Sequence, residues 1–124
     1  MKTVNTTKAP MPVGPYSQAV IAQNLVFCSG QIGIDPKTNK LVDGFNKQVR
    51  QIFENIKKIL QVSGSGINQI VKVTVYLTNS GDFETFNKIY ENYIKHKPAR
   101  TTVFVEKLPK KALLEVEVIA INVT

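Results

Sequence analysis

The clearest pattern in the sequence is a helical stripe of apolar residues between Phe45 and Val62. Apolar positions recur there at steps of three and four, with charged residues between them, which predicts an amphipathic helix over 45–62 with one buried face. The next residues, Ser63-Gly64-Ser65-Gly66, end the helix because glycine disfavours helical backbone. The stripe consists of Phe45, Val49, Ile52, Phe53, Ile56, Ile59 and Leu60.

A second pattern, the alternation of apolar and polar residues, predicts strands before and after this helix. Near the N-terminus, two β-prone segments are separated by Gln23-Asn24, a pair that suits a tight hairpin. The residues through Pro15 are rich in proline and predict an extended arm, whereas Asp35–Asn39 predicts a turn. The predicted strands are 18–22, 25–34, 68–77, 101–106 and 114–123.

A second helix is predicted after Asp82, whose carboxylate suits the N-terminus of a helix. Asn87 falls on the apolar side of this helix, where an amide needs hydrogen-bond partners. It either ties down a loop or faces a pocket. The apolar side is made of Phe83, Phe86, Tyr90, Tyr93 and Ile94.

The predicted elements follow the order β-β-α-β-α-β-β within a single domain, residues 1–124. This order predicts an α+β fold in which both helices cover one face of a mixed sheet. The other face of the sheet would stay open. Because several strands carry apolar residues on both sides, we expect the open face to be covered, most simply by another copy of the chain.

Composition narrows the classes of function. An apolar fraction of 43% and a charged fraction of 20% are typical of a globular protein, and no apolar segment is long enough to cross a bilayer. The N-terminus lacks the apolar region of a secretory signal, and the one cysteine, Cys28, cannot form an internal disulfide, so we expect a cytoplasmic protein without a membrane partner. One histidine and one cysteine do not make an ordinary zinc site, and no nucleotide or flavin motif occurs, so no metal or cofactor is expected.

The formal net charge of +7 raises the question of a nucleic-acid partner. The lysines are dispersed over predicted helix faces and turns, and they are dense only at 95–97 and 107–111, which are connectors. A dispersed lysine excess is typical of a solubility feature, so a nucleic-acid partner is not expected.

Glu115 and Glu117 are the first candidates for chemistry. Along 114–121 they share a strand face that turns apolar towards its end, so they need partners other than water. Arg100 begins the preceding predicted strand, and antiparallel pairing across 107–111 would bring it near Glu115. Two interpretations stay open: a structural Arg–Glu ion pair, or a site where Arg100 binds a ligand carboxylate and Glu115 handles a proton or a water molecule.

Gly30 is a further candidate because glycine inside a strand indicates a bulge or the close approach of a ligand to the backbone. Its neighbour Cys28 is most simply a small strand residue. A nucleophilic cysteine needs a nearby base, and His96 lies in a distant connector.

Over almost its whole length the sequence resembles the RidA (YjgF) family of reactive-intermediate imine deaminases. The most specific part of the resemblance is PAR-T followed by LP-x-x-A-x-x-E-x-E. The matching segments are GPYSQA (14–19), CSGQIG (28–33), FNKIYENY (86–93), HKPART (96–101) and LPKKALLEVEVIA (108–120).

This resemblance implies a chorismate-mutase-like fold and a homotrimer whose sheets line a central barrel, with active sites in clefts between subunits. It also implies hydrolysis of 2-imino acids and their enamine tautomers, such as 2-iminobutanoate and 2-iminopropanoate, to 2-oxo acids and ammonia. Such imines are released by pyridoxal-phosphate dehydratases. The family's alternatives, a small-carboxylate-binding regulator and an endoribonuclease, also remain open.

By the same resemblance, Arg100 holds the substrate carboxylate and Glu115 positions or activates water. The chain departs from the family pattern at Thr102, where many members have cysteine, and at Gly33, which stands in place of a usual proline. We expect the first to change substrate preference and the second to loosen a strand end. The remaining residues expected to bind substrate are Tyr16, Ser29, Gly30, Asn87 and Thr102.

Overall fold

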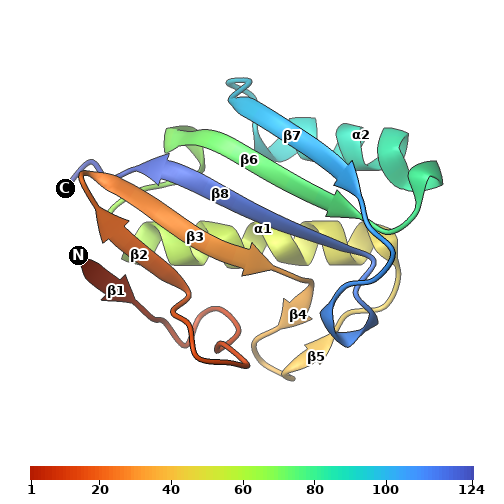
Figure 1. The fold of residues 1–124 in the computed structure, drawn as a ribbon, viewed down its shortest axis with the longest axis horizontal. Helices are drawn as coiled ribbons and strands as arrows, with labels where there is room; N and C mark the ends of the chain where they lie inside the picture. Colours follow the sequence, from red (N-terminus) through yellow and green to blue (C-terminus); the bar gives the residue numbers. More distant parts are fainter.

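The computed structural model describes residues 1–124 and confirms the predicted α+β fold, with two α-helices on one face of a mixed sheet (Figure 1). The helices are α1 (Phe45–Val62) and α2 (Phe83–Tyr93). The strands are β1 (Lys2–Val4), β2 (Ala19–Ala22), β3 (Leu25–Gln31), β4 (Ile34–Asp35), β5 (Lys40–Leu41), β6 (Ile70–Leu77), β7 (Ala99–Phe104) and β8 (Leu114–Ile121). Three single 3-10 turns are η1 (Ile67–Gln69), η2 (Ser80–Asp82) and η3 (Pro109–Lys111).

The main sheet has the strand order β1-β2-β3-β8-β6-β7, and β4 and β5 form a separate small hairpin. Only β6 and β7 pair in parallel; the other neighbours are antiparallel. The predicted hairpin at Gln23-Asn24 is confirmed, because both residues have a positive φ and β2 pairs directly with β3. The short strands β1 and β5 were not predicted, and the predicted strand 25–34 is divided, because β3 ends at Gln31 and Ile34 begins β4.

The predicted antiparallel pairing of the two C-terminal strands is wrong. β6 lies between β7 and β8, and it pairs with both of them. The reason is the crossover through α2: a helix between two strands carries the chain back to the same end of the sheet, so β7 runs parallel to β6 along its outer edge. Alternation within a strand carries no information on which strand becomes its neighbour.

The core lies between α1 and the sheet. The helical stripe predicted from the sequence is buried, with Ile52, Phe53 and Ile56 fully inaccessible to solvent. Across from them lie the inward residues of the central strands, among them Val75 and Val116. Each such side chain contributes about 1.5–3 kcal/mol by leaving water, so this layer holds the sheet on which the candidate site is built.

Asp82 stands at the N-terminus of α2 as predicted, but its carboxylate makes no capping hydrogen bond. The turn η2 runs directly into α2, so Asp82 already has helical backbone angles (φ −91°, ψ −2°), whereas a capping residue needs extended ones. The capping role passes to Asn79, whose Oδ1 accepts a hydrogen bond from the Gly81 amide at 2.8 Å.

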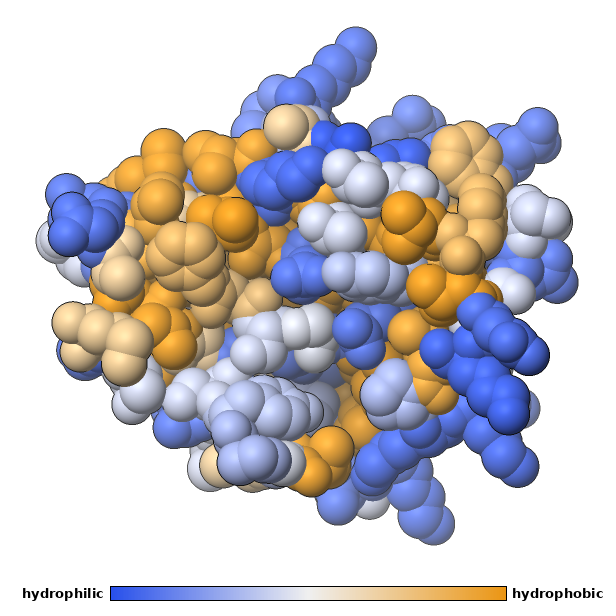
Figure 2. Space-filling model, viewed as in Figure 1, coloured by the Kyte–Doolittle hydropathy of each residue, from blue (hydrophilic) through white to orange (hydrophobic).

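The sheet face opposite the helices is open, and part of it is apolar. Figure 2 shows an apolar area on this face over β3 and the end of β8. Phe27 pairs with Ile119 there, and Phe27 and Ile121 keep 42% and 39% of their surface exposed. The expected apolar character of the open face is therefore confirmed. No helix of the protein has the length and apolar character needed to cross a membrane.

Candidate functional site

Arg100 lies on the edge strand β7 and points towards α2. It pairs in register with Val73, a fully buried residue on the helix-covered face of β6. One guanidinium nitrogen donates a hydrogen bond to the Asn87 side-chain oxygen at 2.8 Å. The guanidinium carbon lies 4.8 Å from the ring centroid of Tyr90, 5.5 Å from that of Phe86 and 5.8 Å from that of Phe83.

These contacts fix the cation without neutralising it. Aromatic rings attract a guanidinium through their negative faces, and Asn87 uses one of its five N–H donors. An open depression of about 530 Å³ borders Arg100. The remaining donors suit the two oxygens of a carboxylate. Asn87 thus orients Arg100 from α2 and does not itself line the depression, so its expected role at the substrate stays a prediction.

Two buried hydroxyls lie on this side of the sheet, those of Tyr90 and Thr102. Neither makes a hydrogen bond of good geometry, although the Tyr90 hydroxyl lies close enough to the Arg100 guanidinium to interact with it. Thr102 lies two residues beyond Arg100 on the same strand face. Burial raises the pKa of the Tyr90 hydroxyl, and the charge of Arg100 opposes this shift. A buried hydroxyl without a good partner costs free energy, and of these two residues Tyr90 lines the depression beside Arg100 whereas Thr102 does not.

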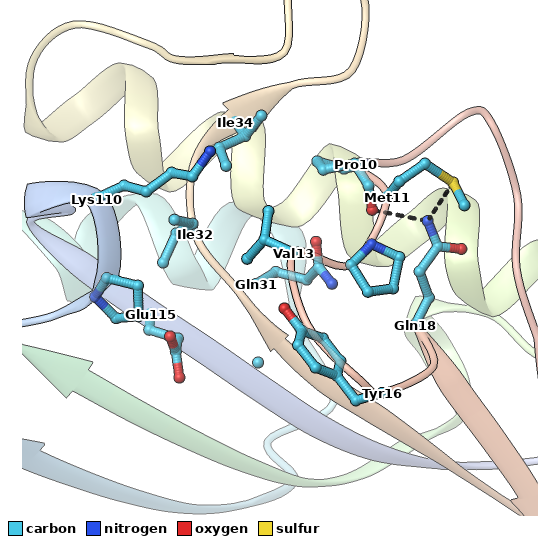
Figure 3. A pocket seen from close by; sticks show the side chains of 13 residues that line it. Pro10, Met11, Val13, Tyr16, Gln18, Gln31, Ile32, Ile34, Lys110 and Glu115 are labelled. Carbon is cyan, nitrogen blue, oxygen red and sulfur yellow. Dashed lines mark hydrogen bonds between the residues drawn. The ribbon is translucent and has the colours of Figure 1, made fainter.

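Glu115 belongs to a different cluster, on the open face of the sheet. It lines a cavity of about 80 Å³ between β3, η3 and the N-terminal arm, residues 5–18 (Figure 3). In Figure 3 the Tyr16 hydroxyl and the Glu115 carboxylate both point into this space. The remaining wall includes Val13, Gly30, Gln31, Ile32 and Lys110.

Gly30 lies directly under the Glu115 side chain. A Cβ atom at Gly30 would come within 2.5 Å of the Glu115 Oε2 atom, so only glycine leaves room for the carboxylate. The strand register also shifts between Cys28 and Gln31, which confirms the bulge predicted at Gly30. The group that approaches the backbone is the chain's own carboxylate.

Burial raises the pKa of the Glu115 carboxyl, and the nearby charge of Glu117 raises it further. Glu117 itself accepts a hydrogen bond from the Tyr76 hydroxyl. Burial also raises the pKa of the Cys28 thiol to about 12, and the charge of Glu117 adds to this. A thiol with this pKa is not a nucleophile at neutral pH, in agreement with its interpretation as a small strand residue.

The arm that carries Tyr16 is held by Gln18. The Gln18 side chain is fully buried; it donates hydrogen bonds to the carbonyls of Thr6 (3.0 Å) and Pro10 (2.8 Å), and it accepts one from the Thr6 amide (2.6 Å). These bonds fold the arm over the end of β3 and shape one wall of the cavity (Figure 3).

Ser29 and Gly33 have structural roles beside the cavity. The Ser29 hydroxyl donates to the Ser17 carbonyl at 2.7 Å, and Ser29 does not line the cavity. Gly33 is buried against α1, where a Cβ atom would lie 2.8 Å from the Gln48 Cα atom. The absence of a side chain at Gly33 therefore lets the helix pack closely, and the expected loosening of the strand end stays a prediction.

Within one chain the predicted residues form two clusters that do not meet. Arg100, Asn87 and Thr102 lie on the helix-covered side of the sheet edge. Tyr16, Gly30 and Glu115 lie at the cavity on the open side, because Glu115 pairs with Tyr76, three residues beyond Val73 and therefore on the opposite face of β6. The predicted proximity of Arg100 and Glu115 within one chain is wrong, because it depended on the wrong strand pairing.

Sequence reasoning did not assign functional positions to Gln18, Tyr90 or Lys110. The aromatic spacing around Asn87 was assigned only to the core, although an amide three residues before Tyr90 is a signal of a polar pocket. Lys110 lines the cavity because η3 places it in a left-handed conformation (φ 56°), and no local sequence signal predicts this at a lysine.

Comparisons with known proteins agree on one family. The family described as Endoribonuclease L-PSP matches residues 6–122. A RutC family protein of Aquifex aeolicus is 52% identical over 98% of this chain and 100% of its own length. The human 2-iminobutanoate/2-iminopropanoate deaminase is 41% identical over 98% of this chain and 90% of its own.

Among solved structures, the crystal structure of Escherichia coli TdcF with bound serine superimposes with a TM-score of 0.94. The two chains are 37% identical, and the match covers 98% of each. Sequence and structure thus agree over nearly the full chain, and the protein belongs to the RidA (YjgF) family.

Proposed function

We propose that the protein hydrolyses small 2-imino acids and their enamine tautomers, such as 2-iminobutanoate and 2-iminopropanoate, to 2-oxo acids and ammonia. The proposed site lies between two copies of the chain. Arg100 of one copy binds the substrate carboxylate, and Glu115 of the other positions the attacking water. Tyr16 and Gly30 would accompany Glu115, with Ser29 holding the segment next to Tyr16 through its hydrogen bond to the Ser17 carbonyl, and Asn87 and Thr102 would accompany Arg100.

The observation that carries this proposal is the pair of incomplete half-sites. One half is a fixed cation with unused donors, and the other is a partly buried carboxylate beside a small cavity. Each lacks what the other supplies. The name of the human relative and the serine bound to TdcF support a small substrate with a carboxylate.

The open sheet face supplies a surface for the assembly. Its apolar residues Phe27, Ile119 and Ile121 would leave water on association. We propose a homotrimer with the open faces lining a central barrel, as the family resemblance implies. We also propose that it acts in the cytoplasm, where a free thiol such as that of Cys28 stays reduced.

The chemistry needs few groups. The carbon of an imine is electrophilic, and protonation of the nitrogen increases this. The protein has to hold a small anion beside a water molecule and stabilise the charges that develop. A guanidinium on the carboxylate and a carboxyl group beside the water supply these functions.

A coupled assay tests the proposal. A threonine or serine dehydratase generates the imine, and the disappearance of the imine is followed with and without this protein. We expect Arg100→Ala to abolish acceleration, because one bidentate anchor is lost and misplacement of the substrate costs about 100-fold or more. Arg50→Ala, on the exposed face of α1, is the matched control. An intact Arg100→Ala protein with undiminished turnover would show that Arg100 is not the anchor.

The same assay separates the second candidate, a regulator that binds small carboxylates without turnover. The Arg100 cluster alone would suffice for such binding. Calorimetry with serine or 2-oxobutanoate then gives binding that depends on Arg100, while the imine disappears at the uncatalysed rate. An endoribonuclease would instead cleave RNA and bind it with strong salt dependence.

A further inference from the structure

The open sheet face carries three ionisable side chains next to one another: Glu115, Glu117 and Tyr76. Of these, only Glu115 has a role in the proposed reaction. Glu115 and Glu117 lie two residues apart on the same face of β8. Tyr76 lies directly opposite Glu115 on β6, whereas Thr74 lies opposite Glu117. Side chains on one strand face at this spacing are about 7 Å apart at their Cα atoms, close enough for their charges to interact.

The hydrogen bonding within this group is unequal. Tyr76 could reach the glutamate directly opposite, but its hydroxyl donates diagonally to Glu117. Glu115 receives no donor from the chain and packs its carboxylate over Gly30. The two neighbouring carboxyl groups therefore have different environments: Glu117 is held by a hydrogen-bond donor, and Glu115 has no donor and is partly desolvated beside Glu117. Such pairs are a recurrent way of giving one carboxyl group the role of an acid.

We propose that Tyr76 and Glu117 are positioning residues for Glu115: the Tyr76 hydroxyl holds the Glu117 side chain beside Glu115, and Glu115 is the proton donor of the reaction. The inference rests on the proposed function. It adds that Glu115 carries its proton when the reaction begins.

The groups around Glu115 agree with this assignment. β3 contributes only the neutral Gly30 and Gln31 to the cavity. In Figure 3 the Lys110 side chain points away from the Glu115 carboxylate. Within one chain, the titratable side chains that face Glu115 or share its cavity are Glu117 on β8, Tyr76 on β6, Lys110 in η3 and Tyr16 on the arm. In the proposed assembly, Arg100 of the neighbouring copy lies across the substrate and is engaged by the substrate carboxylate.

The proton balance is complete without another reactant. Protonated Glu115 gives its proton to the imine nitrogen while water adds to the carbon, and the electrons of the C=N bond move to nitrogen. The Glu115 carboxylate then takes a proton from the added water, which leaves a carbinolamine. In the second half, Glu115 protonates the amino group as the C–N bond breaks and recovers its proton from the hydroxyl, giving ammonia and the 2-oxo acid.

The test is Glu117→Gln, which removes the charge but keeps an oxygen that can accept the Tyr76 hydrogen bond. Glutamates labelled with 13C at the carboxyl carbon are titrated by NMR, with the Glu115 signal assigned from Glu115→Gln. We expect Glu115 to titrate at lower pH in Glu117→Gln than in the wild type. We also expect the alkaline limb of kcat/KM to move to lower pH, with a several-fold loss of turnover at neutral pH. Glu54→Gln on the exposed face of α1 is the matched control for loss of one glutamate charge.

Tyr76→Phe tests the second member of the pair. It should move the Glu115 titration in the wild-type background and leave it unmoved in Glu117→Gln, because Tyr76 acts through Glu117. An unchanged Glu115 titration in Glu117→Gln, or an unmoved pH profile in a protein that turns over imine, overturns the inference. Absence of turnover in the wild type overturns the proposed function instead. The titration needs no substrate, so it still decides whether Glu117 and Tyr76 act on Glu115.

Discussion

At the scale of single residues, the fit between Gly30 and Glu115 shows how backbone and side chain together set the state of a carboxyl group. The missing Cβ at Gly30 lets the carboxylate lie against the strand, and this position removes part of its hydration. Burial, helped by the charge of Glu117, then raises the pKa of Glu115. A group whose pKa is raised by folding binds its proton more tightly in the native state, so its ionisation costs stability.

The raised pKa of Glu115 leads to a prediction for the stability of Glu115→Gln. In the wild type, stability is lost as pH rises from the ordinary value of 4.5 through the raised pKa of Glu115, because the native state must release the proton that it favours. Gln cannot ionise and escapes this loss. Relative to the wild type, Glu115→Gln should therefore gain melting temperature between about pH 4 and pH 7. Thermal unfolding at both pH values measures this gain; an equal difference at both would contradict the raised pKa.

The sequence predicted the special nature of Gly30, Asn87, Arg100 and Glu115, because each breaks the pattern of its element. It did not predict which of them meet. Asn87 and Arg100 come together through the parallel pairing of β7, which brings the strand edge against α2. Glu115 stays on the other side of the sheet. A strand pattern tells which residues share a face of that strand. The order in which strands pair decides which residues of different strands lie next to each other.

At the scale of elements, predictability followed length and periodicity. The bounds of α1 agree with the prediction because a long apolar stripe is followed directly by glycines. The strands β1, β4 and β5 have two or three residues each, too few for alternation to show. The N-terminal arm was predicted as extended, but the sequence did not indicate that Gln18 would fasten it over β3.

The arm provides the prediction at this scale. Gln18→Leu keeps a side chain of similar size in the buried position but removes the hydrogen bonds to Thr6 and Pro10. Because buried backbone groups then lack partners, we expect a loss of about 2–4 kcal/mol in the free energy of unfolding and a detached arm. Urea unfolding measures the loss, and limited proteolysis should cut within residues 5–16.

A matched control is Gln51→Leu on α1, whose side chain bonds only to the amide oxygen of Asn55. This change leaves the arm in place and should not increase cleavage there. An arm that stays resistant to protease in Gln18→Leu would mean that the prolines alone hold it.

At the scale of the whole molecule, the chain presents two separate clusters of polar residues on opposite faces of one sheet, and an exposed apolar surface on the open face. Neither cluster has all the groups that imine hydrolysis needs. If the proposed assembly is correct, each interface takes Arg100 from one copy and Glu115 from its neighbour, so that burial of the apolar face and completion of the site are the same event. The activity of the protein would then depend on association as well as on folding.

Complementation tests this arrangement. Arg100→Ala and Glu115→Gln are expected to be inactive alone, but a co-expressed mixture purified through two different tags contains interfaces with both native groups. In the proposed trimer, every assembly that carries both tags has one of its three interfaces with both native groups, so activity should recover to about a third of the wild-type value. The control pairs Arg100→Ala with Asn87→Ala: both changes fall in the same half-site, so no interface is restored. Mixed assemblies of the first pair that stay inactive would mean that the two half-sites do not serve one reaction.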